Sequence, residues 1–138
     1  MSLKIYFACS VRGGRDDAAL HSKIIEHLKN YGEVLTEHLA DDRLTASGES
    51  LKESFVHDRD LKWVFDCDVV VAEVSTPSLG VGYELGRAVE NKKKVLCLFR
   101  SDGKKLSAMI RGCPDVTVAE YDDLNDAKKV IDKFLVRK

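Results

Sequence analysis

The chain has 138 residues, a length typical of one domain that is large enough to bury a core without disulfides or metal ions. Hydrophobic residues make up 44% and charged residues 33% of the chain, and the formal net charge is only -1. This balance is typical of a globular protein and argues against nucleic acid as a partner, which favours a basic surface. We therefore expect one domain over residues 1–138.

The first half of the chain predicts strand, helix, strand and helix in that order. Leu3–Ala8 is short, apolar and rich in strand formers, and it stops at a Ser/Arg/Gly cluster. A helix follows, with Asp16 or Asp17 as its cap and Gly32 where it ends, because apolar residues recur at helical spacing between them. Glu33–His38 predicts a second strand. A second amphipathic helix then runs to about residue 66.

The second half repeats this alternation. Apolar strands are expected at Asp68–Val74 and Lys94–Phe99, with a helix between them at Gly80–Asn91. They are followed by a short helical piece at Ser107–Arg111, a weaker strand at Val116–Tyr121 and a last helix at Leu124–Leu135. Strands that are apolar on both faces and alternate with helices predict a parallel sheet covered on two sides. The fold class is thus α/β: a doubly wound, flavodoxin-like or Rossmann-like five-stranded parallel sheet with helices on both faces.

In such sheets a ligand binds outside the carboxyl ends of the strands, so the loops after the first, third and fourth strands are the ones to inspect. The first of them, CSVRGGR, offers the Ser10 hydroxyl, backbone amides near Gly13, and the guanidinium groups of Arg12 and Arg15 just before a helix. This combination suits a phosphate. It matches neither a dinucleotide-binding nor a Walker motif, and a turn with solvated arginines remains the alternative.

Two acids attract attention near the other loops. Glu84 lies about one turn into the third helix and is expected to lean back toward the carboxyl edge of the sheet, because helical side chains point toward the N-terminus. Complementing the helix dipole is its alternative role. Asp60 lies in the segment HDRDLKW, where most acids face solvent and only one needs to face inward.

Metal, disulfide and membrane chemistry find no support in the pattern. The four cysteines form no C-x-x-C pair, and the four histidines have no metal-ligand spacing. The longest apolar run, around Val69–Ala72, is far too short to span a bilayer, and no charged-then-apolar leader is present. We therefore expect no metal, no membrane partner and a cytoplasmic location, with the nucleus as well if the source is a eukaryote.

Four separated blocks together resemble one known family. YFACSVRGGR, HDRDLKW, DVVVAEVSTPSLGVGYELGRAV and LSAMIRG closely resemble the 2'-deoxynucleoside 5'-phosphate N-hydrolases of the nucleoside 2-deoxyribosyltransferase superfamily, from Ile5 to about Gly112. The resemblance implies hydrolysis of the N-glycosidic bond of deoxynucleoside monophosphates, with no cofactor. Two alternatives stay open, base exchange by a deoxyribosyltransferase and a nucleotide-binding module without turnover, and the preferred base is not determined.

The resemblance also assigns the catalytic residues. Glu84 corresponds to the nucleophile that attacks the anomeric carbon, Asp60 to the acid that helps the base depart, and Tyr6 to a tyrosine that positions the nucleophile. This is the logic of retaining glycosidases, whose two carboxyl groups lie about 5–5.5 Å apart. It requires Asp60 to hold a proton that Glu84 lacks, so their surroundings are expected to push the two pKa values apart.

The remaining assignments concern the phosphate. The resemblance implies substrate contacts from the loops after the first and third strands, at Cys9, Ser10, Val11, Arg12, Gly13, Ser78 and Gly80. Cys9 stands where relatives carry a glycine. It also implies that Ser107 reaches the phosphate from the neighbouring subunit and that Met109 lies close to the ligand. We therefore expect a homodimer whose sites are shared between subunits.

Overall fold

The structure, a computed structural model, describes residues 3–10, 17–37 and 51–136. Strands and helices alternate along it, in the order β1 (Leu3–Cys9), α1 (Ala18–Leu28), β2 (Gly32–Val34), α2 (Glu53–Asp66), β3 (Val69–Glu73), α3 (Leu79–Glu90), β4 (Lys94–Phe99), α4 (Ala108–Arg111), β5 (Val116–Glu120) and α5 (Leu124–Val136).

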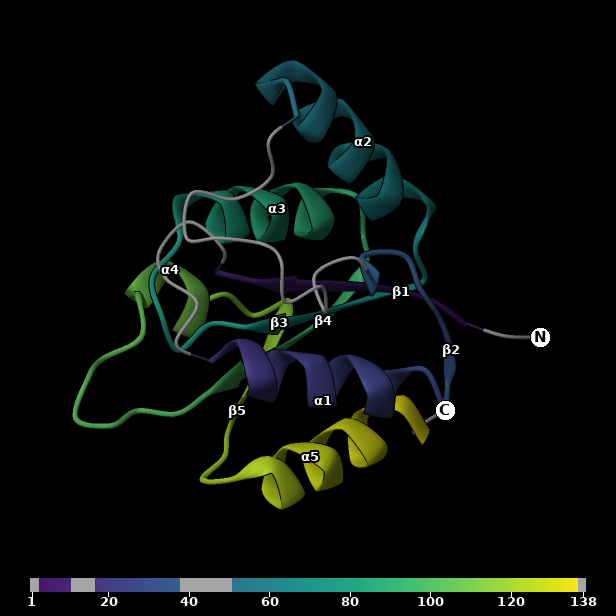
Figure 1. The fold of residues 1–138 in the computed structure, drawn as a ribbon. Helices are drawn as coiled ribbons and strands as arrows, with labels where there is room; N and C mark the ends of the chain where they lie inside the picture. Colours follow the sequence, from purple (N-terminus) through teal and green to yellow (C-terminus); the bar gives the residue numbers. More distant parts are fainter. Residues whose placement is uncertain (1–2, 11–16, 38–50, 137–138) are drawn as a thin grey trace.

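The five strands form one parallel sheet in the order β2-β1-β3-β4-β5. Figure 1 shows α1 and α5 on one face of this sheet and α2 and α3 on the other. The predicted doubly wound α/β fold is therefore confirmed. The strand order reverses between β1 and β3, and this reversal marks the carboxyl edge beside those two strands as the place for a ligand.

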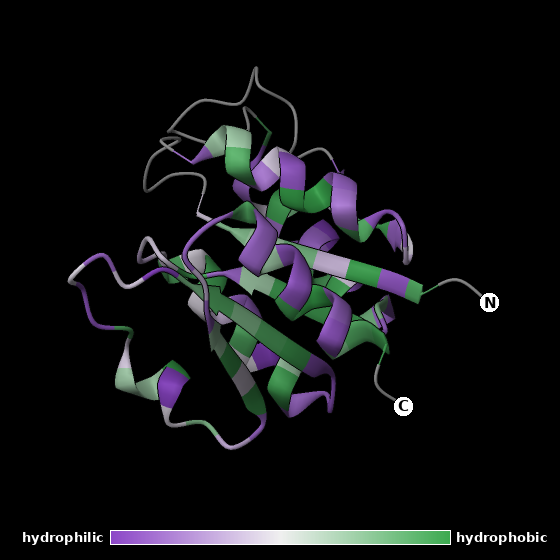
Figure 2. Cartoon of the chain, turned by 90° about the horizontal axis from the view of Figure 1, so that it is seen from below, coloured by the Kyte–Doolittle hydropathy of each residue, from purple (hydrophilic) through white to green (hydrophobic). Residues whose placement is uncertain are grey.

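The sheet separates two hydrophobic cores because successive strand residues point to opposite faces. Ile5, Phe7 and Val71 pack with α1 and α5, whereas Val70 and Ala72 pack with α2 and α3. Figure 2 shows the result: the strands are largely hydrophobic, and hydrophilic residues lie on the helices. Every residue of β3 is buried, which explains why this strand appears as a continuous apolar run in the sequence.

The second strand is shorter than predicted. It covers Gly32–Val34, and the chain turns at residues 35–37 although Glu33–His38 was expected to be extended; His38 lies outside the described residues. The Thr36 hydroxyl donates to the Phe7 carbonyl at 2.7 Å and accepts from the Phe7 amide at 3.0 Å. These two side-chain bonds replace the backbone hydrogen bonds that a longer β2 would make to Phe7 of β1. Gly32 belongs to the strand, and a side chain on it would collide with the neighbouring strand, since a Cβ would lie 2.1 Å from the Leu3 carbonyl oxygen.

Candidate active site

A tyrosine and a glutamate meet at the carboxyl edge, on the face covered by α2 and α3. Tyr6 comes from the middle of β1 and is 1% exposed, and its hydroxyl donates a hydrogen bond to Oε2 of Glu84. Glu84 reaches it from α3, whose start is fixed by Ser78: the Ser78 Oγ caps the helix by accepting from the Val81 amide at 3.2 Å. The Glu84 side chain points toward the N-terminus of α3 and so lies over the sheet, as the sequence predicted.

The surroundings of Glu84 favour its neutral form. Burial raises the pKa of its carboxyl to about 7, the hydrogen bond from Tyr6 opposes this rise, and the nearby Asp60 adds to it. The pKa of Tyr6 is raised far above its ordinary value by burial and then by Glu84 and Asp60, while Arg59 lowers it. Tyr6 therefore keeps its proton and serves as a permanent donor to Glu84.

Asp60 joins this pair from α2 and carries a partner of its own. The Arg59 guanidinium contacts Asp60 Oδ1 through Nη2 at 2.9 Å and Nε at 3.0 Å. A guanidinium at this distance favours the charged form of a carboxyl group. The structure thus brings Tyr6, Asp60 and Glu84 together, and burial raises the pKa of Glu84, whereas the expected reaction needs this carboxyl ionised.

The structure describes only the start of the first loop, at Cys9 and Ser10. Ser10, directly after β1, is 3% exposed, and its Oγ has no hydrogen-bond partner within the described part of the chain, which fits a hydroxyl that a ligand completes. Val11, Arg12 and Gly13 lie outside the described residues. Cys9 is buried with the α1 and α5 core, so its side chain points away from the Tyr6 face.

The other predicted contacts lie at helix starts. Ser78 is the cap residue of α3, and Gly80 lies in its first turn. Ser107 precedes the short helix α4, and its Oγ accepts from the Met109 amide at 3.2 Å. Met109 is 82% exposed, and Ser107 is exposed as well. Figure 1 shows α4 at the carboxyl edge of the sheet.

A second buried carboxyl was missed by sequence reasoning. Glu73, at the end of β3, is 2% exposed and accepts hydrogen bonds from the Ser75 amide, the Ser75 hydroxyl and the Tyr121 hydroxyl at 3.0, 2.6 and 2.5 Å. Arg100 extends this network: its amide donates to Ser75 Oγ at 2.9 Å, and its guanidinium donates to Asp17 at 2.5 Å. An acid inside the apolar run VVVAEV is the signal that could have found it.

The Glu73 network lies on the sheet face opposite Tyr6 and Glu84, because Glu73 alternates with Val70 and Ala72. Asp17 stands at the cap position of α1, yet its side chain makes no cap hydrogen bond and pairs with Arg100. The network therefore links the start of α1 to the loops after β3 and β4.

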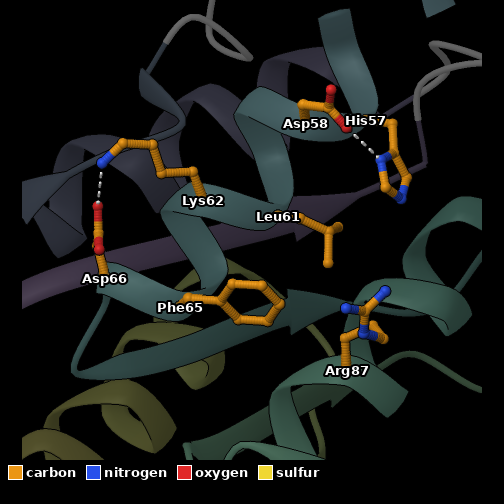
Figure 3. A pocket seen from close by; sticks show the side chains of 7 residues that line it. All are labelled: His57, Asp58, Leu61, Lys62, Phe65, Asp66 and Arg87. Carbon is orange, nitrogen blue, oxygen red and sulfur yellow. Dashed lines mark hydrogen bonds and ion pairs between the residues drawn. The ribbon is translucent and has the colours of Figure 1, made fainter. Parts of the chain in front are cut away.

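An open groove of about 390 Å³ lies between α2 and α3. Figure 3 shows the side chains that line it: His57, Asp58, Leu61, Lys62, Phe65, Asp66 and Arg87. Tyr6, Asp60 and Glu84 do not line it. At its rim the Tyr83 hydroxyl accepts from Arg87 at 2.6 Å and lies 2.8 Å from Nε2 of His57. The groove is thus a surface feature of the two helices and is separate from the carboxyl pair.

Over residues 3–10, 17–37 and 51–136, no three His, Cys, Asp or Glu side chains gather closely enough to hold a metal ion. In the same ranges no helix combines the length and the apolar character that crossing a bilayer demands.

The fold and site define a class: a doubly wound α/β protein with two carboxyl groups and a tyrosine at the switch point of its sheet. The family model described as nucleoside 2-deoxyribosyltransferase matches residues 5–129, so the chain belongs to the nucleoside 2-deoxyribosyltransferase family. The predicted family resemblance is therefore confirmed.

Relatives in animals carry a more specific name. The chain is 58% identical over 114 residues to the 5-hydroxymethyl-dUMP N-hydrolase of Mus musculus, covering 80% of this chain and 66% of that one. It is 47% identical over 136 residues to the enzyme of the same name from Homo sapiens, covering 94% and 78%. Among solved structures, a Clostridium botulinum CMP N-glycosidase shares the fold with a TM-score of 0.70 and 17% identity, over 94% of this chain and 98% of that one.

Proposed function

We propose that the protein hydrolyses the N-glycosidic bond of 2'-deoxynucleoside 5'-monophosphates and releases a free base and 2-deoxyribose 5-phosphate. The observation that carries the proposal is the partly buried Tyr6–Glu84 hydrogen bond with Asp60 beside it at the ligand edge of the sheet. The names of the animal relatives, which describe N-hydrolases of a deoxynucleoside monophosphate, support this substrate class. A place in nucleotide-pool salvage or sanitation follows from the chemistry.

The reaction proceeds in two steps on the carboxyl pair. Glu84 attacks C1', and the bond from C1' to the base nitrogen breaks while Asp60 gives its proton to the departing base. In the second step Asp60 takes a proton from water, and the water oxygen bonds to C1' as the bond to Glu84 breaks. Tyr6 holds the attacking carboxylate in place through its hydrogen bond.

The first step needs an ionised Glu84 and a protonated Asp60, whereas burial raises the pKa of Glu84 and the Arg59 guanidinium lies 2.9 Å from Asp60. One proton must therefore pass from Glu84 to Asp60 when the nucleotide binds.

The phosphate is held by the loops after β1 and β3. Ser10 offers a buried hydroxyl without a partner in the described residues, and Ser78 and Gly80 lie at the positive end of the α3 dipole. Arg12 supplies the guanidinium. Ser107 and Met109, which project from α4, act in the site of a second copy, so the active form is a homodimer.

The test is turnover of a panel of deoxy- and ribonucleoside monophosphates, including 5-hydroxymethyl-dUMP, with the released base quantified by chromatography. We expect release from deoxynucleotides only, and near-complete loss of release in Glu84→Gln with nucleotide binding retained. Normal turnover by this variant would show that Glu84 is not the nucleophile. The Arg12→Ala variant is expected to lose preference for nucleotides over plain nucleosides; an unchanged preference would remove Arg12 from the phosphate site.

The family match favours one second candidate, base exchange between deoxynucleosides. It is separated from hydrolysis by adding a free acceptor base to the same assay. Hydrolysis yields deoxyribose 5-phosphate whether or not the acceptor is present, whereas transfer yields a new nucleoside or nucleotide at the expense of free sugar. Exclusive formation of the exchange product would replace the proposed reaction.

A further inference from the structure

Arg59 is held in place by two aromatic rings of its own helix. Its guanidinium carbon lies 4.8 Å from the ring centre of Trp63 and 5.7 Å from that of Phe55, one turn after and one turn before it on α2. Contacts of this kind contribute about 0.5–1 kcal/mol each at exposed sites and more where water is excluded. The Arg59 side chain is only 18% exposed, so the rings fix the plane and position of the cation.

The guanidinium held in this way contacts one oxygen of the Asp60 carboxyl through two of its nitrogens, at 2.9 and 3.0 Å. A two-nitrogen contact restricts the rotation of a carboxyl group as well as its charge. Asp60 is 19% exposed and close enough to Tyr6 and Glu84 to raise the pKa of each. Arg59 also lowers the pKa of Tyr6, which places the cation within reach of the whole cluster.

We propose that Arg59 is a positioning residue of this active site: fixed between Phe55 and Trp63, it orients the Asp60 carboxyl toward Tyr6 and Glu84 and keeps it charged before the nucleotide binds. This inference rests on the proposed function, because it gives Asp60 and Glu84 their roles. Arg59 does not take part in bond breaking. It sets where the single proton of the carboxyl pair resides.

Within the described part of the chain, the groups that shift the pKa values of Tyr6 and Glu84 come from three elements. Tyr6 belongs to β1, Glu84 to α3, and Asp60 and Arg59 to α2, so Arg59 is the cation among the groups that shift the pKa of Tyr6. Removing its charge strengthens proton binding by Asp60. Because two coupled acids titrate as a pair, both apparent pKa values of the pair rise together, and the pH range of the singly protonated, reactive form moves upward.

The experiment compares pH profiles of kcat/KM for 5-hydroxymethyl-dUMP hydrolysis in the wild type and three variants. In Arg59→Gln we expect both limbs to move upward by about one pH unit, since a cation this close typically shifts a carboxyl pKa by ~1–3 units. Arg59→Lys keeps the charge but not the planar contact, so its profile keeps the wild-type limbs at a lower kcat. Lys62→Gln removes a cation of the same helix that pairs with Asp66 at 3.0 Å, and its profile is expected to match the wild type.

An Arg59→Gln profile that differs from the wild type in height alone would overturn the proposal and leave Arg59 a structural residue. A second measurement is independent of turnover: carbon NMR titration of the side-chain carboxyl groups in the wild type and Arg59→Gln. We expect the two titration steps of the Asp60–Glu84 pair to rise together in the variant, and unchanged steps overturn the proposal. If no nucleotide is hydrolysed, the proposed reaction fails while this titration still decides the role of Arg59.

Discussion

Replacing Glu84 by Gln should make the protein more stable, and increasingly so as the pH rises. Burial holds the pKa of this carboxyl at about 7 in the folded protein, against an ordinary value of 4.5. Between these values the folded chain keeps a proton that the unfolded chain has lost, so folding stability falls as the pH increases through this window. Glutamine has no proton to lose and still offers an oxygen to the Tyr6 hydroxyl.

The size of the effect follows from the shift. At about 1.4 kcal/mol per pKa unit, the wild type loses about 3 kcal/mol between pH 4.5 and pH 8 through Glu84 alone. The gain of Glu84→Gln over the wild type should therefore grow by about that amount across the window and level off above it. Such a gain is a large part of the 5–15 kcal/mol that stabilises a typical domain.

The assay is urea unfolding of both proteins at several pH values from 4.5 to 9, with the difference in unfolding free energy plotted against pH. Glu90→Gln, which removes an exposed carboxyl at the end of the same helix, controls for the loss of one negative charge. A difference between wild type and Glu84→Gln that stays constant with pH would refute the reasoning, because it would mean that Glu84 ionises as readily in the folded chain as in the unfolded one.

Three further outcomes are expected. Tyr6→Phe removes a hydrogen bond that favours ionised Glu84. Because such bonds contribute about 1.5–3 kcal/mol, the acid limb of the pH profile of kcat/KM should move up by about 1–2 pH units. An acid limb that does not move would contradict this role of Tyr6. Tyr121→Phe deprives buried Glu73 of one donor and should lower the unfolding free energy by about 1–3 kcal/mol in urea, with no change as the opposing result. Gly32→Ala places a Cβ 2.1 Å from a backbone oxygen and should lower the unfolding free energy by about 1–3 kcal/mol in the same assay. An unchanged unfolding free energy would mean that β1 and β2 can move apart at no cost.

The central strands could be predicted from the sequence because burial on both faces leaves a continuous apolar run. Lys94–Phe99 is found at its predicted bounds, and β3 falls within the predicted Asp68–Val74. The edge strand β2 could not be predicted as well. Only one of its three residues is buried, and its extended course ends where the Thr36 hydroxyl takes over the hydrogen bonds of β1.

The site was predictable where helix geometry decides the direction of a side chain, as for Glu84, and where a family motif names the partner, as for Tyr6. Arg59 was not recognised, although aromatic residues four positions before and after it are a visible pattern, because charged residues on an amphipathic helix usually face solvent. The proton distribution between Asp60 and Glu84 was beyond the sequence, since it depends on burial and on a guanidinium 2.9 Å away.

The hydrogen-bond network around Glu73 has a consequence for protein engineering. Arg100 and Ser75 connect the segments after β4 and β3, and Arg100 also connects to Asp17 at the end of the first loop. Replacing one of these three segments with the corresponding segment of another enzyme breaks its hydrogen bonds to the other two. Chimeras designed to accept new nucleotides should therefore exchange all three segments as a set.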